Sequence, residues 1–202
     1  MRIKVNGCSK SFVFSDEWQK VKSMPEDPPN SVCIMKVTEA SQCMVLFYQI
    51  DINDIMPFDK TNDVINGIHN AMDKRQGLIE VEASKENCQN IYSIIKSSLE
   101  DNTIQYCLTL HFEYDKKYFN ATGFFSECGM TGVRESVIFE AAKKDGKIGK
   151  KNEGWCFDPY DKNFKKGLLM NLSENKYFDD KFPLHPLSET RRFIKEFLEQ
   201  LK

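Results

Sequence analysis

The 202-residue sequence lacks several features that would assign it quickly to a functional class. It contains no apolar run long enough for a signal peptide or a membrane-spanning helix, which predicts a cytoplasmic protein without a membrane partner. It also lacks an excess of one charge, because 28 Lys and Arg residues face 30 Asp and Glu residues, for a net charge of −2. Without a positive field, the chain is not expected to bind nucleic acid.

Paired metal and disulfide motifs are missing as well. The cysteines form no CxxC pair, and their odd, scattered distribution predicts free thiols rather than a disulfide framework or a zinc site. The seven are Cys8, Cys33, Cys43, Cys88, Cys107, Cys128 and Cys156. His69, His111 and His185 share no ligand spacing, and phosphate-loop, dinucleotide and serine-elbow motifs are absent. We therefore predict neither a metal nor a cofactor.

The chain does have alternating apolar residues that predict strands separated by short turns. Residues 103–114 alternate most clearly, since Tyr106, Leu108, Leu110 and Phe112 fall on one face. The other predicted strands are 10–15, 32–39, 42–51, 77–84, 90–98 and 117–126. Short connections imply antiparallel neighbours, so the expected fold class is α+β with an antiparallel sheet of about six strands flanked by helices.

Helical spacing of apolar residues predicts three helices, at 61–75, 131–144 and 188–201. Both faces of 42–51 are largely apolar, so we expect the helix at 61–75 to cover one of them. In the second helix, Val133, Val137 and Ala141 form a stripe, with Ile138 and Ala142 beside it, that we expect to face the core. The helix at 131–144 should therefore pack on the sheet.

The segment 146–202 differs from the core in composition, because turn residues alternate with many aromatic side chains. So much aromatic surface would be costly to leave in water, so we expect this segment to wrap the sheet and to end in a docked helix. The domain organisation predicted is one domain, 1–202. Its sheet-and-helix core spans 1–145 and its C-terminal wrap and final helix span 146–202.

The order of these elements resembles the PsbP-like α/β/α sandwich superfamily over residues of about 1–145. The opening Phe12-Val13-Phe14-Ser15-Asp16-Glu17-Trp18 is similar to that superfamily's first strand and Trp, although Asp16 and Glu17 replace the usual Pro and Gly. The tail resembles that of uncharacterised bacterial proteins. The resemblance implies a binding or accessory module rather than an enzyme.

We accordingly expect a non-catalytic intracellular module that binds an unknown protein partner where the aromatic tail meets the sheet. Aromatic and arginine side chains dominate the energetics of protein interfaces. The residues that we expect nearest the binding surface are Trp155, Asp158, Tyr160, Arg134, His185 and Arg191. His185 lies between two prolines, where it could make a structural hydrogen bond or face a pocket.

The alternative is a cysteine-dependent phosphatase that uses Cys128, Arg134 and Asp158. Cys128 and Arg134 are separated by five residues between a predicted strand and a predicted helix, which resembles a phosphate loop. Asp158 would be the general acid. The departures from that pattern are Glu127 beside the thiol, Thr131 in place of Gly and Glu135 after the arginine.

Overall fold

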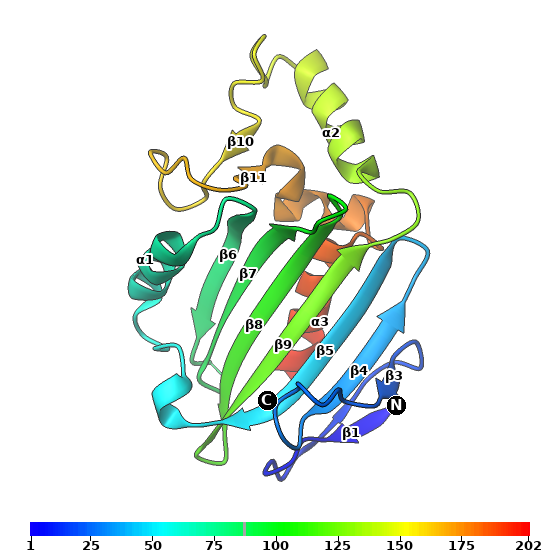
Figure 1. Ribbon diagram of the computed structural model, residues 1–202, viewed down its shortest axis with the longest axis vertical. Helices are drawn as coiled ribbons and strands as arrows, with labels where there is room; N and C mark the ends of the chain where they lie inside the picture. Colours follow the sequence, from blue (N-terminus) through cyan, green and yellow to red (C-terminus); the bar gives the residue numbers. More distant parts are fainter. Residues whose placement is uncertain (87) are drawn as a thin grey trace.

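The computed structural model describes residues 1–86 and 88–202, and a seven-stranded antiparallel sheet is its central element (Figure 1). In spatial order the strands are β3 (Gln19–Val21), β4 (Val32–Val37), β5 (Ser41–Ile50), β9 (Lys117–Glu127), β8 (Ile104–Tyr114), β7 (Asn90–Ser98) and β6 (Gln76–Ser84). The predicted α+β class with an antiparallel sheet is confirmed. The short edge strand β3 was not predicted from the sequence.

One face of the sheet is covered by α3 (Pro186–Gln200), which lies behind the strands in Figure 1. The alternation predicted in β8 is present, since Tyr106 pairs with Phe125 and Phe112 with Phe119, all on the covered face. Phe197 of α3 packs against this face, with its ring centroid 5.1 Å from that of Phe112. This aromatic layer is the main core of the protein.

The opposite face of the sheet is covered by α1 (Thr61–Ala71) only along β6 and β7. Val64 and Ile65 pack with Leu78 of β6 and Ile91 of β7. The expectation that this helix covers residues 42–51 is therefore wrong. Alternation shows which residues share a face of a strand, but it does not show which helix covers that face.

The N-terminal strands β1 (Arg2–Lys4) and β2 (Ser11–Val13) form a two-stranded sheet of their own. Phe12 of β2 enters the core, with its ring centroid 4.9 Å from that of Phe197 and 6.4 Å from that of Phe112. The predicted strand at 10–15 thus exists, although it lies outside the main sheet.

The remaining elements are short and lie mostly in the tail. They are η1 (Ile52–Asp54), β10 (Cys156–Phe157), β11 (Met170–Asn171), η2 (Leu172–Glu174) and η3 (Lys176–Lys181). β10 and β11 pair antiparallel, and the tail crosses the ends of the strands before it enters α3 (Figure 1). Among the described residues, none of the helices is long and apolar enough to cross a membrane.

The helix α2 (Val133–Lys144) extends beyond the strand ends and packs on η2 instead of on the sheet (Figure 1). Ile138 and Ala142 face the tail and are buried. Val133 and Val137, expected in the core, are 40% and 52% exposed. The prediction for this helix is therefore wrong in its buried face, because the covering surface is the tail rather than the sheet.

Candidate binding site

The six residues predicted to form a binding surface lie in three separate places. Trp155 stands edge-on to Phe139 of α2, with ring centroids 5.0 Å apart. Asp158 and Tyr160 attach the tail to the sheet edge and to α1. The carboxylate of Asp158 is 2.9 Å from His69 Nε2 and accepts the backbone N–H of Tyr160. The Tyr160 hydroxyl contacts the backbone N and O of Val81.

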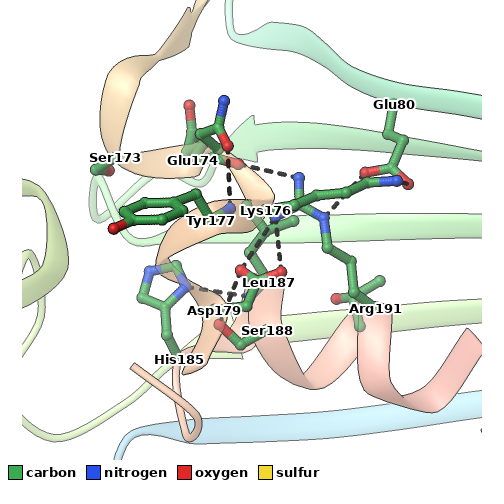
Figure 2. A network of polar contacts seen from close by, with 12 residues as sticks. Glu80, Ser173, Glu174, Lys176, Tyr177, Asp179, His185, Leu187, Ser188 and Arg191 are labelled. Atoms are coloured by element: carbon green, nitrogen blue, oxygen red, sulfur yellow. Dashed lines mark hydrogen bonds and ion pairs between the residues drawn. The ribbon is translucent and has the colours of Figure 1, made fainter. Parts of the chain in front are cut away.

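Arg134, His185 and Arg191, by contrast, lie close together where α2, the tail and α3 meet. Arg191 donates to Glu80 at 2.9 Å and to Asp179 at 3.1 Å, as Figure 2 shows. Arg134 is 1% exposed and also reaches Asp179, at 3.0 Å. Asp179 therefore joins two arginines that lie far apart in the sequence.

These contacts belong to a continuous network, in which Lys176 and Glu82 are exposed and the other members are buried or half-buried. Lys176 pairs with Glu80 and Glu82, and Lys96 pairs with Glu174 at 2.8 Å. The network thus balances four cations, namely Lys96, Arg134, Lys176 and Arg191, against four carboxylates, namely Glu80, Glu82, Glu174 and Asp179. We refer to these eight residues as the ion-pair network. Because its charges are matched, the network attaches the tail to the sheet without leaving a buried member uncompensated.

The three residues of the phosphatase alternative are engaged in internal contacts. The Cys128 thiol donates to the Thr38 carbonyl at 3.5 Å. Arg134 Nε donates to the Ser173 carbonyl, and its other nitrogens donate to Ser188, Asn175 and Asp179. The Gly132 N–H at the start of α2, a natural phosphate donor, is bound instead by the Glu127 carboxylate at 3.1 Å. Nothing in these contacts supports phosphate binding or phosphatase chemistry.

Beside the ion-pair network lies a second cluster, Glu127, Glu135 and His185, whose polar groups are incompletely paired. His185 Nε2 is 3.6 Å from Glu127 Oε1 and 3.8 Å from Glu135 Oε1, too far for hydrogen bonds. Among the described residues, His185 Nε2 and Glu135 Oε2 are buried without a hydrogen-bond partner. Burial raises the pKa of Glu135 above its ordinary value, and the charges of Glu127 and Glu174 add to this effect. We refer to these three residues as the carboxylate cluster.

Two members of the carboxylate cluster, Glu127 and His185, line a pocket of about 520 Å³, and a carboxylate oxygen of Glu135 lies within 4.8 Å of ligand atoms of both. Its polar walls are Glu39, Glu127, Arg134 and His185, and its apolar walls include Ala40, Met130, Val133, Phe182 and Leu184. Met130 is 82% exposed at the rim, and the exposed Val133 and Val137 continue from it along α2. The pocket and this apolar stripe together form one surface, which we call the α2 surface.

The sequence analysis selected Arg134 and His185, which do meet, but it did not select Glu127 or Glu135 as site residues. Both glutamates stood out only as departures from the phosphatase pattern. The sequence signal that could have indicated them is a carboxylate on each side of a strand-to-helix turn. Their convergence on His185, 50 residues further along the chain, depends on the path of the tail.

Comparison with known proteins places the chain only loosely. No family model and no curated protein matches it. Its structure is similar to the solution structure of cyanobacterial PsbP (CyanoP) from Synechocystis sp. PCC 6803, with 14% sequence identity. The match covers 66% of this chain and 81% of that one, with a TM-score of 0.39.

Proposed function

We propose that this chain is a non-catalytic intracellular module that binds another protein through the α2 surface. The observation that carries the proposal is an exposed apolar stripe, formed by Met130 just before α2 and by Val133 and Val137 on that helix, which extends beyond the strand ends (Figure 1). Exposed apolar side chains that adjoin one another and a pocket are typical of interaction sites. The residues first expected at the interface therefore divide into two groups.

Arg134 and His185 belong to the proposed surface, because both line its pocket. The other four residues hold the tail in place and do not line the pocket. They are Trp155, Asp158, Tyr160 and Arg191. Their contacts with α2, α1, β6 and the ion-pair network fix the position of η2, on which α2 packs. The proposed surface thus lies at the expected location, at the junction of tail and sheet. Of the six residues first expected to contact the partner, it retains Arg134 and His185.

The internal contacts of the candidate catalytic groups favour binding over catalysis. A phosphatase needs a free arginine fork and free backbone donors around a thiolate, and here Arg134 and the Gly132 N–H already have partners. A cytoplasmic location belongs to the same proposal. It is supported by the seven cysteines, all in the described part of the chain, which are free thiols.

The test compares two matched double variants. Met130→Asp/Val137→Asp places charges on the α2 surface, whereas Met24→Asp/Ile52→Asp places them on side chains that are 59% and 60% exposed elsewhere. A partner captured from native extract is identified and purified, and its affinity is measured for each form. We expect at least a tenfold loss with the first variant and none with the second. Equal affinities would overturn the proposed surface.

The phosphatase alternative is tested on the same material. Aryl phosphate hydrolysis that is present in the wild-type protein and abolished in Cys128→Ser would contradict the non-catalytic proposal. We expect no hydrolysis above that of the buffer.

A further inference from the structure

The carboxylate cluster differs from its surroundings in having no cation of its own. Glu127 and Glu135 form ion contacts only with His185 among the described residues, whereas each carboxylate of the ion-pair network faces a lysine or an arginine. Arg134 lines the same pocket, but its charge is already paired with Asp179 at 3.0 Å. Two carboxylates this close, and largely buried, require a cation or a proton.

A second, independent observation comes from His185, which is 7% exposed and directs Nε2 toward both carboxylates. Nδ1 accepts the Leu187 N–H at 3.2 Å, where His185 caps α3, and Arg134 Nη1 lies 3.5 Å from the same atom. Both neighbours are donors, so Nδ1 carries the lone pair and Nε2 carries the ring proton. Nε2–H is therefore a buried donor without an acceptor at hydrogen-bonding distance in residues 1–86 and 88–202.

This tautomer distinguishes between two kinds of positive ligand. The ligand atoms of Glu127, Glu135 and His185 lie within 4.8 Å of one another, which would suit a divalent metal ion. A metal, however, needs the lone pair of Nε2, and the capping bond to Leu187 keeps that lone pair on Nδ1. An organic cation needs only the carboxylates, and Nε2–H can then donate to Glu127 once the carboxylate shifts toward it.

We propose that the pocket receives an arginine side chain of the partner protein, with its guanidinium between Glu127 and Glu135. A guanidinium offers five N–H donors in a planar fork, so it can bond two carboxylates at once. The apolar walls, including Met130, Val133 and Leu184, suit the methylene stem. The exposed Glu39 adds a third negative charge at the pocket wall. This inference rests on the proposed function and specifies the chemistry of the partner.

The experiment uses the full chain and two small probes of equal shape. N-acetyl-arginine methylamide carries the guanidinium, and N-acetyl-citrulline methylamide carries a neutral urea group in its place. Binding is followed by NMR at two places. One is the backbone amide of Gly132, whose N–H donates to the Glu127 carboxylate, and the other is the ring of His185. We expect the arginine probe to bind saturably and at least tenfold more tightly than the citrulline probe. Glu127→Gln and Glu135→Gln should each weaken it tenfold or more, whereas Glu140→Gln, an exposed change on α2, should not.

Three results would overturn the inference: equal binding of the two probes, no saturable binding of the arginine probe, or tight binding of Zn²⁺ or Mn²⁺ that is lost in His185→Gln. Each is distinguishable from failure of the proposed function. If the inference alone fails, Met130→Asp/Val137→Asp still weakens the partner. If the proposed function fails, that variant has no effect, whatever the probes do.

Discussion

Two polar clusters lie side by side at the end of the sheet, and they differ in completeness. The ion-pair network matches its four cations with four carboxylates, and each member has a partner within the chain. In the carboxylate cluster, His185 Nε2 and Glu135 Oε2 have no hydrogen-bond partner within the described part of the chain. Complete buried networks fix a structure, and incomplete ones cost stability unless a ligand completes them. We therefore assign the first cluster to the fold and propose that the second binds a ligand.

The largest effect should follow from breaking the complete network. Lys96→Met leaves Glu174, which is 1% exposed, without its cation. Removing one partner of a buried ion pair typically lowers the free energy of unfolding by about 3 to 5 kcal/mol. Urea titration measures this change. The matched variant Lys20→Met, at an exposed lysine of β3, should cost less than about 0.5 kcal/mol. Similar losses in the two variants would show that the network contributes little.

A second complete polar contact should govern stability in acid. His111 Nδ1 accepts the Met56 N–H at 2.9 Å, and burial lowers the pKa of His111 to about 4. The unfolded chain takes up this proton near pH 6.5, before the folded protein does. The contribution of His111 to the free energy of unfolding should therefore be fully present above about pH 6.5. It should fall by about 3 kcal/mol as the pH is lowered from about 6.5 to 4.

The change that isolates this effect is His111→Asn, whose amide can still accept the Met56 N–H but cannot titrate. Urea titrations at several pH values should show a weaker pH dependence for the variant than for the wild-type protein. The same slope in both would refute the assignment to His111.

A smaller effect of opposite sign is expected in the carboxylate cluster. The pKa of Glu135 is raised by burial, so its charged form destabilises the fold at pH 7. Glu135→Gln should raise the free energy of unfolding at pH 7, on the order of 0.5 kcal/mol, as relief of a strained functional site often does. The gain should shrink as the pH falls through the raised pKa and vanish once Glu135 is protonated in both states. If Glu135→Gln instead lowers the free energy of unfolding at pH 7, the charged form of Glu135 stabilises the fold and the prediction is wrong.

The smallest effect is expected on the exposed stripe. Met130→Asp/Val137→Asp should change the free energy of unfolding by less than about 0.5 kcal/mol, since both side chains are largely in solvent. Thermal or urea unfolding measures this directly. A loss as large as that of Lys96→Met would mean that the stripe packs within the fold and is not free for a partner.

Much of the fold was predictable because the sheet follows local alternation. Every strand of six residues or more lies within a residue or two of its predicted position, and α1, α2 and α3 begin near theirs. The short strands β1, β3, β10 and β11 have two or three residues, too few for a period to appear. The surfaces on which α1 and α2 pack were also not predicted. The exposure of Val133 and Val137 is set by the tail, through contacts remote in sequence.

The site was predictable only in part for the same reason. Arg134 and His185 were selected for their residue types, and the structure brings them within 3.5 Å of each other. Their neighbours Glu127 and Glu135 are recognised as candidate site residues only once two facts are known. These are the position of His185 near both carboxylates and its tautomer, which the bond from Leu187 fixes. Neither fact has a local signal in the sequence.

The most direct test of the distinction between the two clusters is the urea midpoint of Glu127→Gln/Glu135→Gln, with and without saturating N-acetyl-arginine methylamide. A ligand that binds only the folded state raises the free energy of unfolding by RT ln(1 + [L]/Kd), and the urea midpoint rises with it. We predict that the probe raises the midpoint of the wild-type protein and not that of the variant. We also predict that the variant without probe is at least as stable as the wild type. A variant that is less stable than the wild type and still stabilised by the probe would contradict the account.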